Sequence, residues 1–169
     1  FTVYTYIQPL LTEVAGFAES AVSPILLVFG VGMIVGNLLG GKFADRSLMP
    51  ALLGTLATLT LVIGLMTFAL HSQWAMVLFV GLLGAAAFAT VSPLQLWVLQ
   101  KAEGAQSLAS SLNIGAFNLG NAFGAWLGGA VIMHGAGLGA LTWVGALVPL
   151  SALLVALYSV SLQKRSDRL

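Results

Sequence analysis

Long apolar runs alternate with short polar or glycine-rich segments along the whole chain. Because a helix needs about 20 apolar residues to cross a hydrocarbon core of about 30 Å, each long run is a candidate transmembrane helix. The first run is short, and we interpret it as a helix truncated at its N-terminal end. The pattern predicts six transmembrane helices, at residues 1–15, 24–41, 50–70, 74–99, 108–133 and 138–162.

Proline positions refine the expected helix boundaries. Ser23 and Pro24 predict an N-cap followed by a proline at the first helical position, and Pro50 predicts the start of the next helix. Pro93 and Pro149 fall inside their apolar runs, where they predict kinks that neighbouring helices tolerate.

The composition identifies the surrounding solvent. The chain has 169 residues, of which 59% are hydrophobic and 7% charged, and its mean hydropathy is +1.03. A water-soluble domain of this size needs far more charge on its surface, so we expect an all-α membrane protein in contact with a lipid bilayer. The net charge of +1 comes with basic residues spread over three segments, which argues against a nucleic-acid partner.

The residue types also argue against several kinds of chemistry. There are no cysteines, which removes disulfides and thiolate metal sites from consideration. We find no triad candidate, phosphate-binding loop or cluster of metal ligands in the sequence. We therefore expect a protein that is not an enzyme, with no cofactor and no metal.

The basic residues predict the orientation of the chain. If the six helices alternate in direction, all basic residues fall on one side, which the positive-inside rule makes cytoplasmic. We thus expect a multi-pass plasma-membrane protein, in a bacterium the inner membrane, with the segments 42–49 and 100–107 and the C-terminus in the cytoplasm. The basic residues are Lys42, Arg46, Lys101, Lys164, Arg165 and Arg168.

Two of the expected helices carry glycines four residues apart. Such a ladder leaves one helix face without side chains, so another helix can approach to backbone contact within the bilayer. Because the second and fifth helices run in opposite directions, the ladders predict two inverted three-helix repeats. The glycines are Gly32, Gly36 and Gly40 in one helix and Gly120, Gly124 and Gly128 in the other.

The segment from Gly41 to Arg46, GKFADR, resembles the second copy of a loop motif of the major facilitator superfamily: glycine, three residues, aspartate and a basic residue. Tyr4 to Pro9 and Asn118 to Asn121 are similar to the twelve-helix drug:proton antiporter branch, near the arabinose- and purine-efflux-like permeases. The resemblance covers the whole chain. It implies the C-terminal six-helix half of a transporter, with the N-terminal half absent from this chain.

The resemblance also implies roles for the helices. The first and fourth line a central cavity, the second and fifth face the other half, and the third and sixth face lipid. Polar residues are consistent with this, since they gather on single faces of the first and fourth helices. The expected cavity residues are Tyr4, Thr5, Gln8, Phe88, Ser92, Gln95, Asn118 and Asn121.

The amides at membrane depth have two interpretations. They can face a ligand, because an amide turned to lipid leaves its donors and acceptors unpaired, or they can join neighbouring helices by hydrogen bonds. We favour the cavity for Gln8 and Gln95 and leave both interpretations open for Asn118 and Asn121.

The charged residues near the ends of the expected helices also have candidate roles. Gly41, Asp45 and Arg46 are expected to gate the cytoplasmic side, because a carboxylate at a membrane edge can dock on the positive end of a helix. By resemblance, that helix lies in the other half. Glu13 is interpreted as a rim residue rather than a buried proton carrier.

We therefore expect a secondary active transporter that exports a small organic compound, such as a drug, sugar or nucleoside-like molecule, in exchange for protons by alternating access. The alternative is a six-helix channel or structural membrane subunit that forms oligomers. A pore would need a ring or filter of charged or carbonyl groups, for which the sequence gives no sign.

Overall fold

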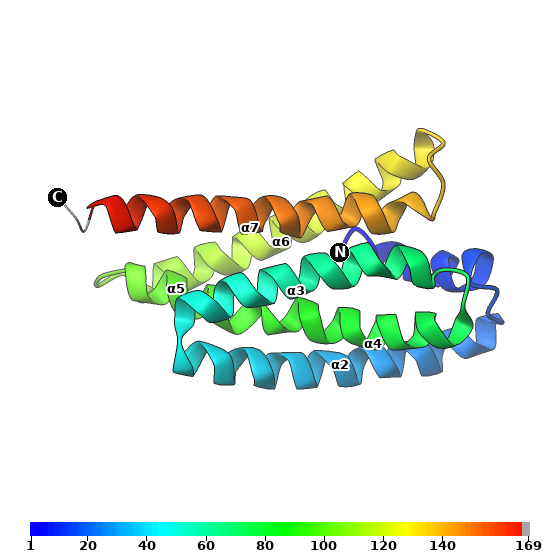
Figure 1. Cartoon of the computed structure of the whole chain (residues 1–169), viewed down its shortest axis with the longest axis horizontal. Helices are drawn as coiled ribbons and strands as arrows, with labels where there is room; N and C mark the ends of the chain where they lie inside the picture. Colours follow the sequence, from blue (N-terminus) through cyan, green and yellow to red (C-terminus); the bar gives the residue numbers. More distant parts are fainter. Residues whose placement is uncertain (167–169) are drawn as a thin grey trace.

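The computed structural model describes the backbone of residues 1–166 and the side chains of residues 1–162, and all regular structure within that range is helical (Figure 1). Three short helical turns precede six longer helices. The turns are η1 (Tyr4–Tyr6), α1 (Ile7–Pro9) and η2 (Leu10–Val14), and the helices are α2 (Glu19–Arg46), α3 (Leu48–Ala69), α4 (Gln73–Ala89), α5 (Val91–Lys101), α6 (Gln106–Met133) and α7 (Ala140–Ser166).

Four helical stretches are long and apolar enough to cross a membrane: Glu19–Arg46, Leu48–Ala69, Gln73–Lys101 and Ala140–Leu162. α6 is as long as α2, at 28 residues, but it carries several serines and asparagines that lower its hydropathy. The all-helical membrane fold is thus confirmed. The count of six spans and the inverted repeat stay predictions.

The start of α2 differs from the expectation. The helix begins at Glu19 after Ala18, so Pro24 lies inside it and the predicted Ser23 cap with Pro24 at the first position is wrong. A proline here removes the hydrogen bond to the carbonyl of Ser20, one turn earlier. Ser20 and Pro24 are both exposed, so the local surroundings tolerate that loss. Pro50, by contrast, lies in the first turn of α3, close to its predicted place.

The segment 42–49 is not a loop. α2 continues to Arg46 and α3 begins at Leu48, so Ser47 alone joins the two helices in an extended conformation, with φ −163° and ψ 100°. Asp45 and Arg46 therefore belong to the last turn of α2, which corrects their placement in a loop. The helix can continue through this segment because Lys42, Phe43 and Ala44 all have a better helix propensity than glycine or proline.

The first segment is not one continuous helix. Residues 4–14 form three consecutive turns of different pitch, ending in a π-helical turn from Leu10 to Val14. Gly16 then reverses the chain at φ +72°, a conformation that glycine adopts easily. Leu10 and Leu11 are fully buried, so this short segment anchors one end of the bundle.

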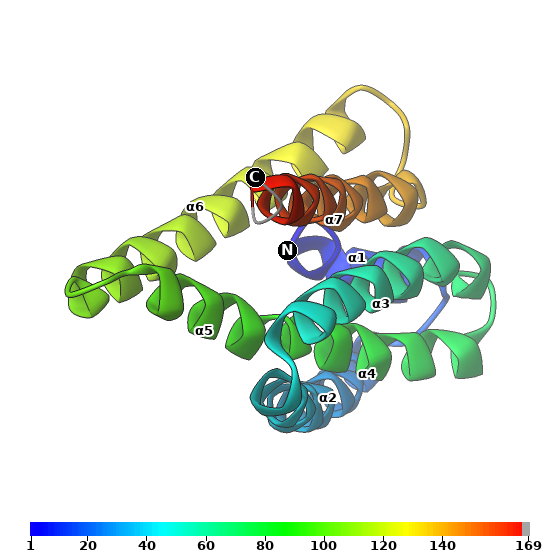
Figure 2. The same ribbon diagram turned by 60° about the vertical axis from the view of Figure 1, so that its left-hand side comes forward.

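The core lies where the first segment, α2, α3, α4 and α7 meet. Fully buried Met66 of α3, Met76 of α4 and Leu141 of α7 join the two leucines of the first segment in one cluster. α4 packs along α2 on one side and against α3 on another, and α3 in turn packs along α7. Figure 2 shows α5 and α6 diverging from this core as a helical hairpin.

The connections between helices gather at the two ends of the bundle. Figure 1 shows the α2–α3 join, the α5–α6 connection and the end of α7 at one end, with the α3–α4 and α6–α7 connections at the other. The long helices thus alternate in direction. Of the basic residues on which the predicted orientation rests, Arg168 and the side chains of Lys164 and Arg165 lie outside the described part of the chain.

Candidate functional site

The glycine ladder of α2 packs on α4. A methyl group built on Gly36 would lie 2.7 Å from the Cα atom of Ala85, and one on Gly40 would lie 2.8 Å from the Cα atom of Ala89. Gly32 faces the backbone of Gly81 in the same way. These separations are too short for any side chain, so the two helices meet backbone to backbone.

This contact identifies which face of α2 is free to face the other half, as the resemblance implied for the second helix. The glycine face is covered by α4 of the same chain. The opposite face of α2 carries exposed aliphatic side chains, including Val31, Ile34 and Leu38. That face, rather than the glycines, is available to lipid or to a further domain.

The glycine ladder of α6 has a mixed environment. A methyl group on Gly124 would lie 3.1 Å from the backbone nitrogen of Thr2, and one on Gly128 would lie 2.5 Å from Cε2 of the Tyr6 ring. The Tyr6 hydroxyl donates a hydrogen bond of 3.0 Å to the carbonyl of Ala125. Gly120 faces open space, so the first segment covers only the later part of this ladder.

The expected fourth span is interrupted at Thr90. α4 ends at Ala89 and α5 begins at Val91, with the buried Pro93 in the first turn of α5. A proline at position 93 lacks the N–H that would bond to the Ala89 carbonyl, and its ring crowds that carbonyl. At the junction, the Thr90 hydroxyl donates a hydrogen bond of 2.7 Å to the carbonyl of Ala87. The predicted effect of Pro93 on the helix thus appears as a break just before it.

A cluster of polar side chains joins α5 to α6. The Gln95 amide donates a hydrogen bond of 2.8 Å to the Ser110 hydroxyl, and its carbonyl oxygen accepts one from the Asn113 amide. Gln95 and Asn113 are half-buried. Both ends of the Gln95 amide are thus engaged between helices, and its predicted contact with a ligand stays a prediction.

A second polar pair lies between α5 and α2. The Ser92 hydroxyl donates a hydrogen bond of 3.2 Å to the side-chain oxygen of Asn37. The same Ser92 oxygen is the atom nearest to a methyl group built on Gly41, at 3.9 Å. Phe88, one turn before Ser92, is half-buried. The polar face of α5 thus contacts helices on both sides.

The first segment presents the other expected cavity residues. Tyr4 stacks on Phe29 of α2 with ring centroids 4.5 Å apart, so its ring packs between elements. Thr5 and Gln8 are exposed. The backbone carbonyl of Gln8 accepts a hydrogen bond of 3.1 Å from the Thr12 hydroxyl. The side chains of Thr5 and Gln8 remain accessible to a ligand.

The two asparagines of the α6 ladder are also accessible. Asn118 is exposed and Asn121 half-buried. The neighbouring Leu119 and Phe123 are exposed large apolar residues, so this part of α6 offers amides and apolar groups on one accessible helix.

Sequence reasoning missed three partners of the predicted residues: Asn37, Ser110 and Asn113. Asn37 lies within the repeated glycine pattern of the second helix, and its polarity at membrane depth was the available signal. Ser110 and Asn113 are three residues apart on one face of α6, a spacing that marks a shared helix face.

Acidic residues lie at the periphery. Glu13 is exposed in the π-helical turn, and Asp45 is exposed at the end of α2. Among the described residues, no three histidine, cysteine or acidic side chains gather in a way that would hold a metal ion. The polar groups that the helices bring together in the membrane are thus neutral amides and hydroxyls.

Comparison with known proteins extends these observations. The family model described as Major Facilitator Superfamily matches residues 1–168. The chain is 43% identical over 163 residues to the "Inner membrane transport protein YdhP" of Escherichia coli (strain K12), covering 96% of this chain and 42% of that protein. It is 32% identical over 154 residues to the "Probable sugar efflux transporter" of Helicobacter acinonychis, covering 90% of this chain and 39% of that protein.

A third relative is the "Uncharacterized MFS-type transporter YtbD" of Bacillus subtilis, 37% identical over 169 residues, which are 98% of this chain and 42% of that protein. The chain thus spans about two fifths of the length of the curated relatives that it matches. These relatives are named as transport proteins, and the expectation of a protein that is not an enzyme is confirmed on that ground.

Proposed function

Because the chain belongs to the major facilitator superfamily, we propose that it is the C-terminal six-helix half of a secondary transporter that exports a small organic compound in exchange for protons. The transport cavity would form between this half and six further helices upstream. Alternating access would come from rocking of the two halves around that cavity.

The polar cluster of α5 and α6 is the observation that carries this proposal. Gln95, Ser110 and Asn113 are joined by hydrogen bonds within otherwise apolar helices, and polar groups at such depth normally mark a substrate or ion pathway. Asn118 and Asn121 continue the polar positions of α6 along the accessible part of that helix.

The substrate class follows from the neutral character of these groups. Amides, hydroxyls and the aromatic ring of Phe88 can hydrogen-bond and pack against an uncharged molecule, but they provide no partner for a buried charge. Since one relative is named "Probable sugar efflux transporter", the proposed substrates are sugars, beside nucleoside-like compounds and hydrophobic drugs.

The energy-coupling group would lie in the upstream half. A proton antiporter needs a titratable side chain that faces the cavity, and residues 46–102 and 104–166 contain no aspartate or glutamate. Glu13 and Glu19 lie close to the opposite end from Asp45. This half would then contribute substrate contacts, while Gly41, Asp45 and Arg46 act at the cytoplasmic gate.

The test uses everted membrane vesicles that contain the complete transporter and a fluorescent indicator of internal pH. Respiration acidifies the vesicles, and a transported sugar, nucleoside or drug should then raise the internal pH as protons leave in exchange. Gln95→Leu should raise the substrate concentration needed for half of this response, because it removes the amide between α5 and α6.

The control is Gln100→Leu, since Gln100 is exposed at the end of α5, and it should respond like the wild type. If none of the three substrate classes moves protons through a wild-type protein that is folded and inserted, proton-coupled export of such compounds is wrong. Equal effects of the two substitutions would remove Gln95 from the substrate pathway.

A further inference from the structure

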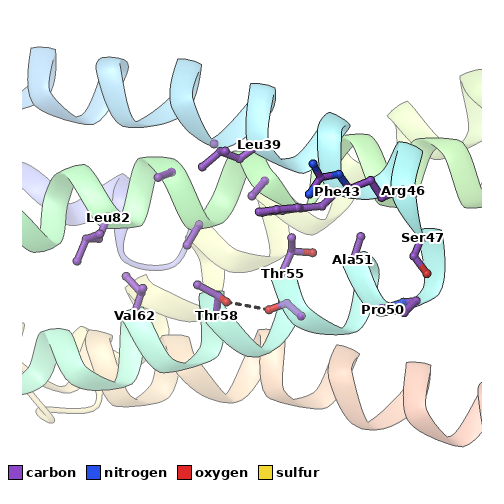
Figure 3. A pocket seen from close by; sticks show the side chains of 15 residues that line it. Leu39, Phe43, Arg46, Ser47, Pro50, Ala51, Thr55, Thr58, Val62 and Leu82 are labelled. Atoms are coloured by element: carbon purple, nitrogen blue, oxygen red, sulfur yellow. Dashed lines mark hydrogen bonds between the residues drawn. The ribbon is translucent and has the colours of Figure 1, made fainter.

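A groove lies between α2, α3 and α4, and its lining residues include none of the polar cluster of α5 and α6. Its cavity has a volume of about 490 Å³, within the range of roughly 300 to 1,000 Å³ that small-molecule sites occupy. Figure 3 shows the side chains that line it, with Arg46 and Phe43 toward one end and Leu82 and Val62 toward the other. We refer to this cavity as the Arg46 groove.

The walls of the Arg46 groove are apolar in effect. Glycine and alanine form much of the lining, for example Gly54, Ala85 and Ala89. The hydroxyl of Thr55 bonds to the carbonyl of Leu52 at 3.1 Å, and that of Thr58 bonds to the carbonyl of Gly54 at 2.8 Å. Both hydroxyls donate to backbone carbonyls of their own helix, so neither needs a hydrogen-bond acceptor on a bound molecule.

The length of the groove matches one leaflet of a bilayer. Its α3 lining runs from Pro50 to Val62, and twelve residues of helix cover about 18 Å at 1.5 Å per residue. Half of a hydrocarbon core is about 15 Å thick. A single extended acyl chain therefore fits the groove along its whole length.

Arg46 places a positive charge at the mouth of the groove. α2 has 28 residues and is thus about 42 Å long, longer than a hydrocarbon core of about 30 Å, so its end reaches the headgroup region. A guanidinium group matches the geometry of a phosphate with two parallel hydrogen bonds. Asp45 is exposed beside it but does not line the groove.

We propose that the Arg46 groove binds one anionic phospholipid, with an acyl chain along α3 and the phosphate on Arg46. Apolar walls, leaflet length and a cation at the headgroup level are the features that such a lipid requires together, since basic pockets between transmembrane helices bind anionic headgroups. The groove contains none of the residues expected to contact the transported substrate. The proposal needs only the membrane location of the chain, although Arg46 is also proposed to act at the cytoplasmic gate.

Gly54 offers a substitution that fills the groove. A methyl group built on Gly54 meets nothing within 4 Å, so Gly54→Leu occupies the space of the acyl chain without a backbone clash. Gly30 of α2 also faces open space but lies outside the groove, and Gly30→Leu is the matched control. Arg46→Gln removes the positive charge at the mouth of the groove. Its control is Lys42→Gln, since Lys42 is exposed on α2 but does not line the groove.

The experiment is native mass spectrometry of the complete transporter in detergent, titrated with phosphatidylglycerol or with phosphatidylethanolamine of the same chains. We expect the wild type to bind one phosphatidylglycerol molecule more tightly than phosphatidylethanolamine. Arg46→Gln should weaken this binding about fivefold, as one basic residue near a membrane surface does. Gly54→Leu should weaken it about tenfold, the loss expected when about two methylenes lose contact.

The two control variants should bind phosphatidylglycerol like the wild type. Unchanged binding in both Arg46→Gln and Gly54→Leu would overturn the proposal. Equal binding of the two lipids would also overturn it, because the charge would then have no role. If Gly54→Leu bound the transported substrate less tightly but kept its phosphatidylglycerol, the groove would be a substrate site instead. Normal melting temperatures in all variants exclude misfolding as the cause of a change.

Discussion

The contact between α2 and α4 makes a sharp prediction for Gly36→Ala. Gly36 faces the backbone of Ala85, and its added methyl group would lie 2.7 Å from the Cα atom of Ala85. Ordinary van der Waals contact begins at 3.4 Å. The carbonyl oxygen of Ala85 would lie closer still. Because backbone atoms cannot rotate away as a side chain can, α2 and α4 must move apart.

The cost is set by two opposing effects. Overpacking a well-packed core costs typically about 1 to 3 kcal/mol, and the rigid neighbour puts Gly36→Ala in the upper part of that range. Replacing glycine by alanine inside a helix is otherwise favourable by about 1 kcal/mol. We therefore expect a net destabilisation of about 1 to 2 kcal/mol.

Gly30→Ala is the matched control on the same helix. A methyl group on Gly30 meets nothing within 4 Å, so only the helix preference remains and this variant should be as stable as the wild type or more stable. The assay is the melting temperature of the complete transporter in detergent, followed by tryptophan fluorescence. Gly36→Ala should melt several degrees below Gly30→Ala, and equal melting temperatures would refute the backbone contact.

Three further predictions concern orientation, gating and coupling. In intact cells, a cysteine at Ser72 should react with an impermeant thiol reagent while one at Ser47 is protected, since the basic end is proposed to be cytoplasmic; the reverse pattern would invert the orientation. Asp45→Asn should increase cytoplasmic access to cavity cysteines, because it removes the charge that favours a helix N-terminus by about 0.3 to 1 kcal/mol; unchanged access would make Asp45 a solvated surface residue. Glu13→Gln should leave substrate-driven proton flux intact, measured in everted vesicles; loss of flux with retained substrate binding would place the coupling acid in this half.

Hydrophobic runs were the most informative part of the sequence, because burial in lipid imposes a minimum length on every spanning helix. They predicted the membrane location and the helical fold, as well as the approximate position of α3. They did not predict the extra turns at both ends of α2, because charged residues such as Glu19 and Arg46 continue a helix beyond the apolar run as readily as they end it.

Residue type alone did not determine which helix covers a glycine ladder. Gly32, Gly36 and Gly40 do predict a close neighbour, but any of the other helices can supply it, and the identity of α4 depends on the whole packing arrangement. The same limit applies to Gln95. Its polarity predicts a partner at membrane depth, while the choice between a ligand and the Asn113 amide is a matter of tertiary geometry.

The central claim is that this chain rocks against an upstream half during transport, and electron paramagnetic resonance distances test it most directly. Spin labels at Ser47 and Ser72, which flank α3 at its two ends, are each paired with a label at the corresponding end of the upstream half in the complete transporter. Adding substrate or lowering the pH should shorten the distance at one end and lengthen it at the other. Distances that stay constant at both ends, or change in the same direction, would contradict alternating access.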